Sequence, residues 1–205
     1  MKRSLRTLGV DDGYFPINYK RCYGRTLLVL TVCEGLKLTN VKMALITVDG
    51  LDGTNAVLNL LRPLCNKYDA VFLDGVTYAG FNIVDPEVVF NETSIPSVVI
   101  FKYGLDLNAV KEALMKNFND WMSRYSTIER TYNSSYVIST PKGNLRIFSC
   151  GVARAEAYEL VLSLQSVNQY PEPLRLADLI ASGLTRNSTL LEMINRYPQA
   201  SYEGI

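Results

Sequence analysis

The chain has 205 residues, of which 48% are hydrophobic and 20% charged, a composition typical of a globular domain with its own core. Its 21 basic and 20 acidic side chains give a formal net charge of +1, so any binding of nucleic acid needs a local basic patch rather than a basic surface. Histidine is absent, which excludes serine–histidine and cysteine–histidine catalysis, histidine-bound zinc and imidazole bases.

The first half of the chain predicts a small antiparallel meander followed by a helix. Apolar runs at residues 6–10 and 26–34 predict two buried strands, and residues 42–48 predict a third, joined to the second by a hairpin over 35–41. Apolar side chains then recur at helical spacing from residue 56, which predicts a helix of about 12 residues with Asp52 or Thr54 as its cap.

The second half alternates strands and helices, an order that implies a parallel half of the sheet. The tail at residues 187–205 is polar at both ends, and we predict either a loose attachment or a partner-binding helix there. The predicted elements are strands at 71–73, 97–101, 136–140 and 145–150, and helices at 106–118, 153–165 and 173–184.

The sequence also indicates where the protein works and how its thiols behave. The basic N-terminus lacks the apolar stretch of a secretory signal, and no run of about 18 apolar residues occurs, so we expect a cytoplasmic protein that does not enter a membrane. The four cysteines form no CxxC pair, which favours buried, reduced thiols over a zinc site or a disulfide scaffold. No repeat or linker divides the chain, so we predict a single domain over residues 1–205.

Two of the predicted strands end in an aspartate that is followed closely by a glycine. The first strand runs into Asp11-Asp12-Gly13, and the strand at 71–73 runs into Asp74-Gly75. If the two strands are neighbours, Asp11 and Asp74 lie at one edge of a sheet, where carboxylate oxygens suit a hard divalent cation. Aspartate and glycine also end many strands simply because they turn well, so the pattern alone leaves both interpretations open.

Several motifs resemble a known family. Gly9-Val10-Asp11 and Phe72-Leu73-Asp74-Gly75 resemble the strands that carry two catalytic aspartates of endonuclease V, and residues 171–178 resemble the closing segment of that enzyme. The motifs at residues 11–13, 47–52, 73–82 and 171–180 resemble more closely a mainly archaeal, endonuclease-V-like family called domain of unknown function 99.

The resemblance spans about residues 4–185 and implies an α/β fold of the ribonuclease H-like type. In that fold an antiparallel meander and then parallel strands form one mixed sheet flanked by helices. It also implies an endonuclease-V-like core at about 4–185, with 187–205 as a C-terminal tail.

The resemblance further implies a metal-dependent nuclease with Mg²⁺ or Mn²⁺ as its cofactor. Asp11, Asp74 and Asp178 are the candidate catalytic residues and metal ligands, and Asp49 or Asp52 would complete the metal shell. Asp178 is equally compatible with a solvated position on an amphipathic helix, and Asp49 and Asp52 with a turn residue and a helix cap.

Two parts of endonuclease V are missing from this sequence. The strand-separating wedge that follows the third strand is replaced by Thr47-Val48-Asp49-Gly50-Leu51, and the next predicted helix contains no glutamate. The lack of both parts allows three hypotheses: a nuclease acting on single-stranded or structured nucleic acid, a binding module that has lost turnover, or a structural protein.

The segment 75–82 is rich in glycine and aromatic residues, which suits contact with nucleic acid. We expect Tyr78 or Phe81 to stack on a base and Asn82 to belong to the same binding surface, although the two rings could instead pack into the core. Arg175 is the candidate phosphate ligand, with an ion pair to Glu172 as the alternative.

Overall fold

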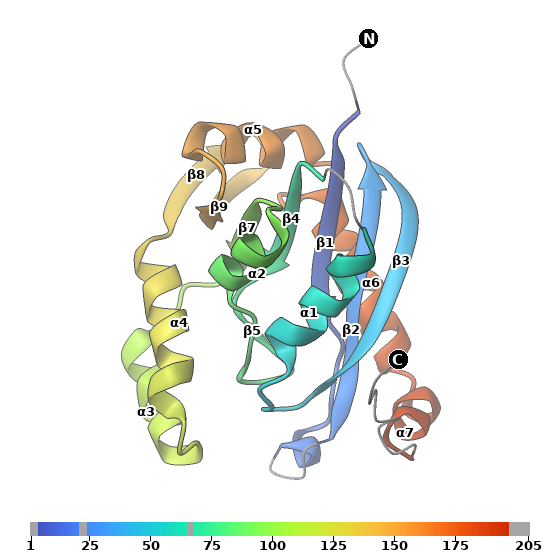
Figure 1. Cartoon of the computed structure of the whole chain (residues 1–205), viewed down its shortest axis with the longest axis vertical. Helices are drawn as coiled ribbons and strands as arrows, with labels where there is room; N and C mark the ends of the chain where they lie inside the picture. The colour runs from blue at the N-terminus through green and yellow to red at the C-terminus, as the bar shows by residue number, and fades with distance from the viewer. Residues whose placement is uncertain (1–3, 21–23, 65–67, 197–205) are drawn as a thin grey trace.

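The structure is a computed structural model that describes residues 4–20, 24–64 and 68–196. A seven-stranded sheet in the order β3-β2-β1-β4-β7-β9-β8 forms its centre (Figure 1). β1, β2 and β3 are antiparallel neighbours, β1, β4 and β7 run parallel, and β9 and β8 are again antiparallel, which confirms the predicted meander and parallel half. The strands are β1 (Arg6–Asp12), β2 (Arg25–Glu34), β3 (Lys37–Thr47), β4 (Ala70–Asp74), β7 (Ser97–Phe101), β8 (Tyr136–Thr140) and β9 (Gly143–Cys150).

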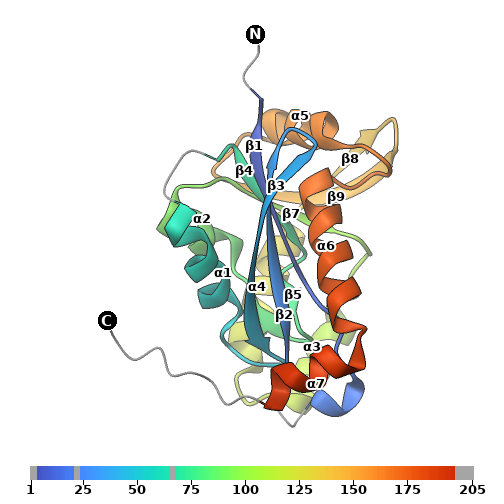
Figure 2. The same ribbon diagram turned by 90° about the vertical axis from the view of Figure 1, so that its right-hand side faces the viewer.

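Helices cover both faces of the sheet, with α1 and α2 on one side and α5 and α6 on the other (Figure 2). A small hairpin, β5 (Thr77–Tyr78) and β6 (Asn82–Ile83), and the α3–α4 pair extend the layer that contains α1. The helices are α1 (Gly53–Leu61), α2 (Pro86–Thr93), α3 (Leu107–Asn117), α4 (Trp121–Asn133), α5 (Arg154–Leu164), α6 (Glu172–Thr185) and α7 (Ser188–Arg196).

The central strand β4 is buried on both faces. Residues 70–73 of β4 are fully buried, because α1 covers one face of the sheet and α5 and α6 cover the other. A continuous apolar run, rather than an alternating one, is the pattern expected of such a strand. The apolar residues therefore end where β4 leaves the core, and Asp74 is the first side chain beyond that point.

Gly9 in β1 sets how closely α6 approaches the sheet. A Cβ atom at this position would overlap the main-chain carbonyl of Pro173 at the start of α6, so only glycine allows this contact. The hydroxyl of Thr31 in β2 donates to the same Pro173 carbonyl at 2.7 Å. The N-terminal end of α6 is thus fixed against β1 and β2, and this places Asp178 on the next turns of the helix.

One strand begins earlier than predicted, and the aspartates at the start of two helices differ in what they bind. β3 starts at Lys37, five residues before the prediction, because a short turn that begins at Gly35 (φ 59°) already closes the hairpin. Asp52 stands at the N-cap position of α1, yet its side chain makes no capping bond there. Asp106 caps α3, because its side chain accepts hydrogen bonds from the main-chain N–H groups of Asn108 and Ala109.

The structure also refines the predictions about the C-terminal tail, the cysteines and the membrane. Within the tail, α7 is attached to the sheet, because Asn195 accepts a hydrogen bond from the main chain of Arg25 at 2.7 Å and donates one back at 3.0 Å. Residues 197–205 lie outside the described residues, as do Cys22 and Cys65. Cys33 is a buried free thiol and Cys150 a partly buried one. Within the described ranges, no helix is both long and apolar enough to cross a membrane.

Candidate functional site

Asp11, Asp74 and Asp178, which we call the acidic cluster, meet around the ammonium group of Lys102. Its Nζ atom lies 2.6 Å from Oδ2 of Asp74, 3.3 Å from Oδ2 of Asp11 and 3.5 Å from Oδ2 of Asp178. β1, β4 and β7 are parallel neighbours, so Asp11, Asp74 and Lys102 all leave the sheet at the same edge. α6, which packs against β1 and β2, adds Asp178. The structure therefore brings together the three carboxylates that the sequence singled out.

The electrostatics of the cluster are those of carboxylates crowded in a poorly solvated place. Burial raises the pKa of Asp11 well above its ordinary value, and the charge of Asp74 raises it further, while Lys102 opposes both effects. Burial also raises the pKa of Asp74, against the lowering effect of Lys102. Burial by itself lowers the pKa of Lys102, but Asp11 and Asp74 outweigh it and the pKa is raised. The ammonium therefore remains charged as the counter-ion of the cluster.

Tyr78 holds the strand ends that carry the cluster rather than binding a ligand. Its ring is fully buried, and its hydroxyl accepts a hydrogen bond from the main-chain N–H of Asp74 at 2.8 Å and donates to the Val10 carbonyl at 3.3 Å. The hydroxyl thus joins the ends of β1 and β4. The prediction that Tyr78 stacks on a base is wrong, because no face of the ring is accessible.

Asp12 likewise has a structural partner. Its Oδ2 accepts a hydrogen bond from the main-chain N–H of Ala79 at 2.9 Å, which holds the β5–β6 hairpin against β1. Burial raises the pKa of Asp12 to about 7, although the bond from Ala79 acts in the opposite direction. The turn at Gly13 is closed by the main chain, where the N–H of Gly13 donates to the Leu27 carbonyl.

The structure does not bring Asp49 and Asp52 to the acidic cluster. Asp49 accepts a hydrogen bond from the main chain of Phe81 at 2.9 Å, and Asp52 accepts bonds from the main chain and hydroxyl of Thr47 and from the Asn82 amide. Both carboxylates therefore tie the β3–α1 loop to the β5–β6 hairpin. Asn82 is fully buried in this network, so its predicted contact with nucleic acid is also wrong.

The two other predicted nucleic-acid contacts are Phe81, for which the contact stays a prediction, and Arg175, which has a protein partner. Phe81 is half-buried and packs edge-on against Phe118, with the ring centroids 5.7 Å apart. The guanidinium of Arg175 bonds to Glu172 at 2.6 and 2.9 Å, so the ion-pair alternative describes this residue. Lys102 was missed, although a lysine directly after a buried apolar strand, β7, which pairs with the strand that ends in Asp74, is a signal that could have found it.

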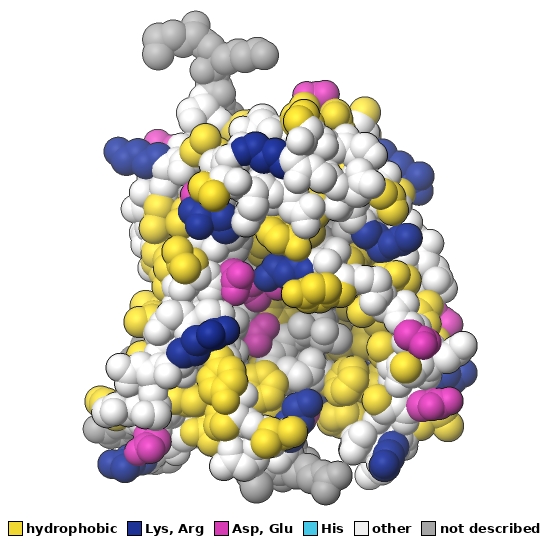
Figure 3. All heavy atoms as spheres, turned by 180° about the vertical axis from the view of Figure 1, so that it is seen from behind, with side chains coloured by type: hydrophobic (Ala, Val, Ile, Leu, Met, Phe, Trp, Pro, Cys, Tyr) yellow, Lys and Arg dark blue, Asp and Glu magenta, His cyan; other side chains and the backbone are white. Residues whose placement is uncertain are grey.

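A pocket of about 400 Å³ opens beside the acidic cluster. Asp74 and Lys102 stand at one end of it, and most of the remaining wall is apolar. Its lining comes from Lys20, Asp74, Gly75, Val76, Thr77, Gly80, Phe81, Phe101, Lys102, Tyr103, Leu105, Val110 and Ile128. On the face opposite to that of Figure 1, acidic and basic side chains meet next to a hollow near the middle of the molecule (Figure 3).

The acidic cluster has the donor atoms that suit a hard divalent cation, but the Lys102 ammonium lies among them. All its donors are carboxylate oxygens, which Mg²⁺ and Mn²⁺ prefer, and they already surround one positive charge. In the part of the chain that the structure describes, no three acidic or cysteine side chains are arranged as a ready metal shell. The Lys102 ammonium stands between the carboxylates, so a metal ion would have to displace it.

The fold is of the ribonuclease H-like type, with the arrangement of strands and helices found in endonuclease V. The catalytic domain of human endonuclease V superposes with a TM-score of 0.57 at 17% identity, covering 92% of this chain and 85% of its own. The endonuclease V of Streptomyces avermitilis gives a TM-score of 0.59 at 13% identity, with 91% and 84% covered. At these identities the likeness concerns the fold, and it confirms the predicted one.

The model of the Endonuclease dU family matches residues 3–185, and the chain belongs to that family. A UPF0215 protein of Thermococcus gammatolerans is 36% identical over 92% of this chain and 97% of its own length. A protein of unknown function from Archaeoglobus fulgidus has a TM-score of 0.73 at 28% identity, with 87% of this chain and 97% of its own covered. These relatives confirm the expected endonuclease-V-like, archaeal family.

Proposed function

We propose that this protein is a divalent-metal-dependent nuclease that hydrolyses phosphodiester bonds in nucleic acid. The observation that carries the proposal is the convergence of Asp11, Asp74 and Asp178, from β1, β4 and α6, on a single cation. These three residues would hold Mg²⁺ or Mn²⁺, which when bound supplies Lewis acidity at the phosphate and lowers the pKa of a coordinated water.

The chain's own groups account for the rest of the site. Asp11 and Asp74 are fixed by the strand ends that the Tyr78 hydroxyl joins, so little reorganisation is needed to present their oxygens. Lys102 lines both the cluster and the pocket, where its ammonium can face a phosphate once it leaves the carboxylates. The apolar pocket next to it has the character of a site for a nucleobase attached to that phosphate.

Related proteins point to the same class of substrate. The family carries the name Endonuclease dU, and the endonuclease V of Ciona intestinalis, a neighbour in fold, was solved in complex with DNA containing an inosine. We therefore propose DNA or RNA with an unpaired or deaminated base as the substrate. Single-stranded or structured nucleic acid fits best, because a base must leave its stack to enter the pocket.

A nucleic-acid-binding protein without turnover is the second candidate. Lys102 already neutralises part of the acidic cluster, and α1 supplies no glutamate as a further ligand. Such a protein would keep the fold, the pocket and the basic group at its end, and would bind nucleic acid in a salt-dependent way without cutting it.

Thermal melting with and without Mg²⁺ or Mn²⁺ and a cleavage assay decide between these functions. The wild type should be stabilised by the metal and should cut at least one of a panel of single-stranded, branched, deoxyuridine-containing and inosine-containing oligonucleotides, whereas Asp74→Asn should lose both effects. Equal cutting by the two proteins would reveal a contaminating nuclease. Salt-dependent binding without cutting would favour the second candidate, and the absence of metal stabilisation would overturn the metal site.

A further inference from the structure

The pocket beside the acidic cluster lies between the β5–β6 hairpin and the α3–α4 helix pair. Gly80 and Phe81 belong to the β5–β6 hairpin and form one wall, whereas Leu105, Val110 and Ile128 come from the loop before α3, from α3 and from α4. The width of the pocket is therefore the distance between this hairpin and the α3–α4 pair.

A buried arginine of α4 connects the two walls. The side chain of Arg124 is 5% exposed, and its Nη1 donates to the Phe81 carbonyl at 2.6 Å and to the Gly50 carbonyl at 2.9 Å. Its Nε is held by both carboxylate oxygens of Asp120, each at 3.0 Å. Arg124 thus reaches from α4 to the pocket wall and to the β3–α1 loop behind it.

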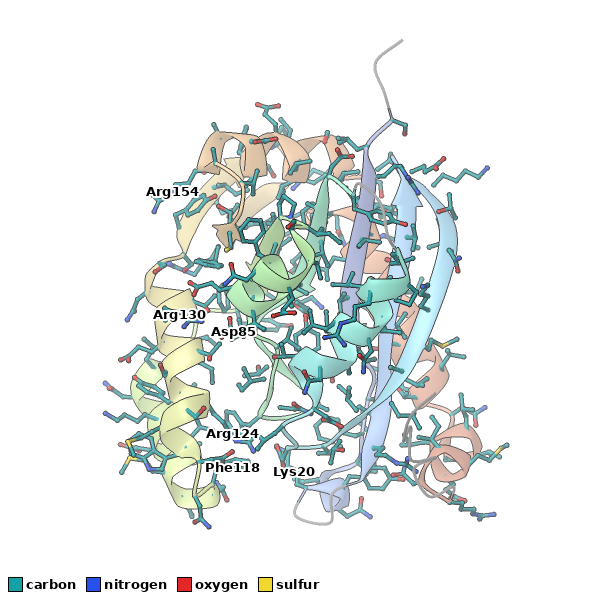
Figure 4. The ribbon with its side chains drawn as sticks, in the orientation of Figure 1. Lys20, Asp85, Phe118, Arg124, Arg130 and Arg154 are labelled. Atoms are coloured by element: carbon teal, nitrogen blue, oxygen red, sulfur yellow. The ribbon has the colours of Figure 1, made fainter. Side chains whose placement is uncertain are left out.

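Phe118 makes a second connection to the same wall. Its ring lies 4.4 Å from the guanidinium carbon of Arg124 and packs edge-on against the ring of Phe81, at an interplanar angle of 75°. Figure 4 shows Arg124 and Phe118 together at the lower end of the α3–α4 pair. Phe81 is therefore held twice, by its carbonyl and by its ring.

The attachment of α4 to the rest of the molecule does not depend on Arg124 alone. Ile128 and Tyr125 anchor the helix in the core, and Arg130 forms an ion pair with Asp85 at 2.9 Å farther along the helix. Burying a guanidinium is costly unless its donors are all used. Arg124 pairs its Nε with Asp120 and gives its Nη1 to the carbonyls of Phe81 in the pocket wall and of Gly50 behind it, so one rigid planar guanidinium joins α4 to both places.

We propose that Arg124 is a positioning residue that sets the width of the pocket and thereby selects a planar nucleobase between Phe81 and the α3–α4 wall. The inference rests on the proposed function in one respect, namely that the pocket receives a base of the nucleic acid. It adds a residue outside the acidic cluster that determines which substrates bind, without taking part in the hydrolysis.

The test compares Arg124→Met and Arg124→Lys with the matched control Arg130→Met, which breaks an ion pair of the same helix away from the pocket. Each full-length protein is titrated, in Ca²⁺, with a short single-stranded DNA that contains one deoxyuridine and with the same DNA carrying an abasic residue there. The wild type should prefer the base-containing DNA by about tenfold, the contribution expected of one well-packed base. Arg124→Met should lose this preference, Arg124→Lys should keep part of it, and Arg130→Met should keep it all.

Hydrogen exchange over residues 79–83 and the melting temperature separate positioning from folding. Arg124→Met should speed exchange in this segment while the metal-induced rise in melting temperature, which reports on the acidic cluster, stays unchanged. Retained preference in Arg124→Met, or an equal loss in Arg130→Met, would overturn the inference. If the wild type cuts but binds both DNAs equally, the inference fails and the proposed function stands; if it neither binds nor cuts, both fail.

Discussion

The Nζ atom of Lys102 lies 2.6 Å from Oδ2 of Asp74, the shortest of three ion pairs through which one ammonium holds the carboxylates of β1, β4 and α6 together. This lysine is the positive charge that the three carboxylates share. The charge of a lysine is fixed to the chain and costs nothing to recruit, so a dissolved cation must compete with it for the same oxygens. This competition makes the affinity for metal a property of Lys102 as well as of the aspartates.

Replacing Lys102 by methionine should therefore raise the affinity for Mn²⁺. The neutral side chain is one atom shorter than that of lysine and removes the competing charge, and we expect a gain of about tenfold, equivalent to ~1.4 kcal/mol. Isothermal titration calorimetry measures it directly. Lys111→Met, which alters a lysine packed over Trp121 and Tyr125 instead, is the control and should leave the affinity unchanged. Equal or weaker binding by Lys102→Met would contradict the competition.

Removing the hydroxyl of Tyr78 should destabilise the protein although the ring is kept. In Tyr78→Phe the main-chain N–H of Asp74 loses its partner in a buried place, which costs about 1–3 kcal/mol of the free energy of unfolding. Urea denaturation measures the loss. Tyr103→Phe removes a hydroxyl from a side chain that is 80% exposed and should change the stability little. Equal stability of the two variants would mean that the hydroxyl of Tyr78 is not needed to join the strand ends.

The acidic cluster could be predicted because its signal lies in local patterns. A buried strand leaves a continuous apolar run, and Asp74 marks the point where that run ends. Asp178 needed the resemblance to a known family, since a single aspartate on an amphipathic helix carries no pattern of its own. The buried polar residues could not be predicted. Asn82 and Arg124 are polar types that usually face water, and only their distant partners explain why they are inside.

The same reason explains why helix α4 was not predicted from the sequence. Its buried stripe includes Arg124, Thr127 and Thr131, so the apolar periodicity that reveals a helix is interrupted by polar side chains. The short elements β5, β6 and α2 carry too few residues for any periodicity. Sequence patterns thus predicted the sheet, which is held by apolar burial, and missed the polar network that shapes the pocket.

The ion pair at the start of α6 predicts a pH dependence of stability. The hydrogen bonds from Arg175 hold the pKa of Glu172 below its ordinary value of 4.5, with Ser166 adding to the effect and burial opposing it. Because the folded state binds the proton less readily than the unfolded state, the contribution is complete above pH 4.5 and is lost as the pH falls through the lowered pKa.

The free energies of unfolding of the wild type and Glu172→Gln should therefore differ by about 1–2 kcal/mol at neutral pH and converge in acid. Urea denaturation over a series of pH values measures the difference. Glu192→Gln, at a pair whose side chains are 60% and 75% exposed, is the control and should show little difference at any pH. A gap for Glu172→Gln that stays constant down to the acid limit would show that the charge of Glu172 is not what stabilises the helix.

Gly9 offers a way to move Asp178 without replacing any residue of the acidic cluster. In Gly9→Ala the new methyl group meets the main-chain carbonyl of Pro173, and a backbone cannot yield as a flexible side chain does. The start of α6 must shift away from β1, which should cost about 1–3 kcal/mol of stability and reduce the metal-induced rise in melting temperature. Gly183→Ala adds the same methyl group later in α6, where no atom lies within 4 Å, and should stabilise the helix slightly. If Gly9→Ala loses stability but keeps the full response to metal, Asp178 does not contribute to metal binding, and the site rests on Asp11 and Asp74 alone.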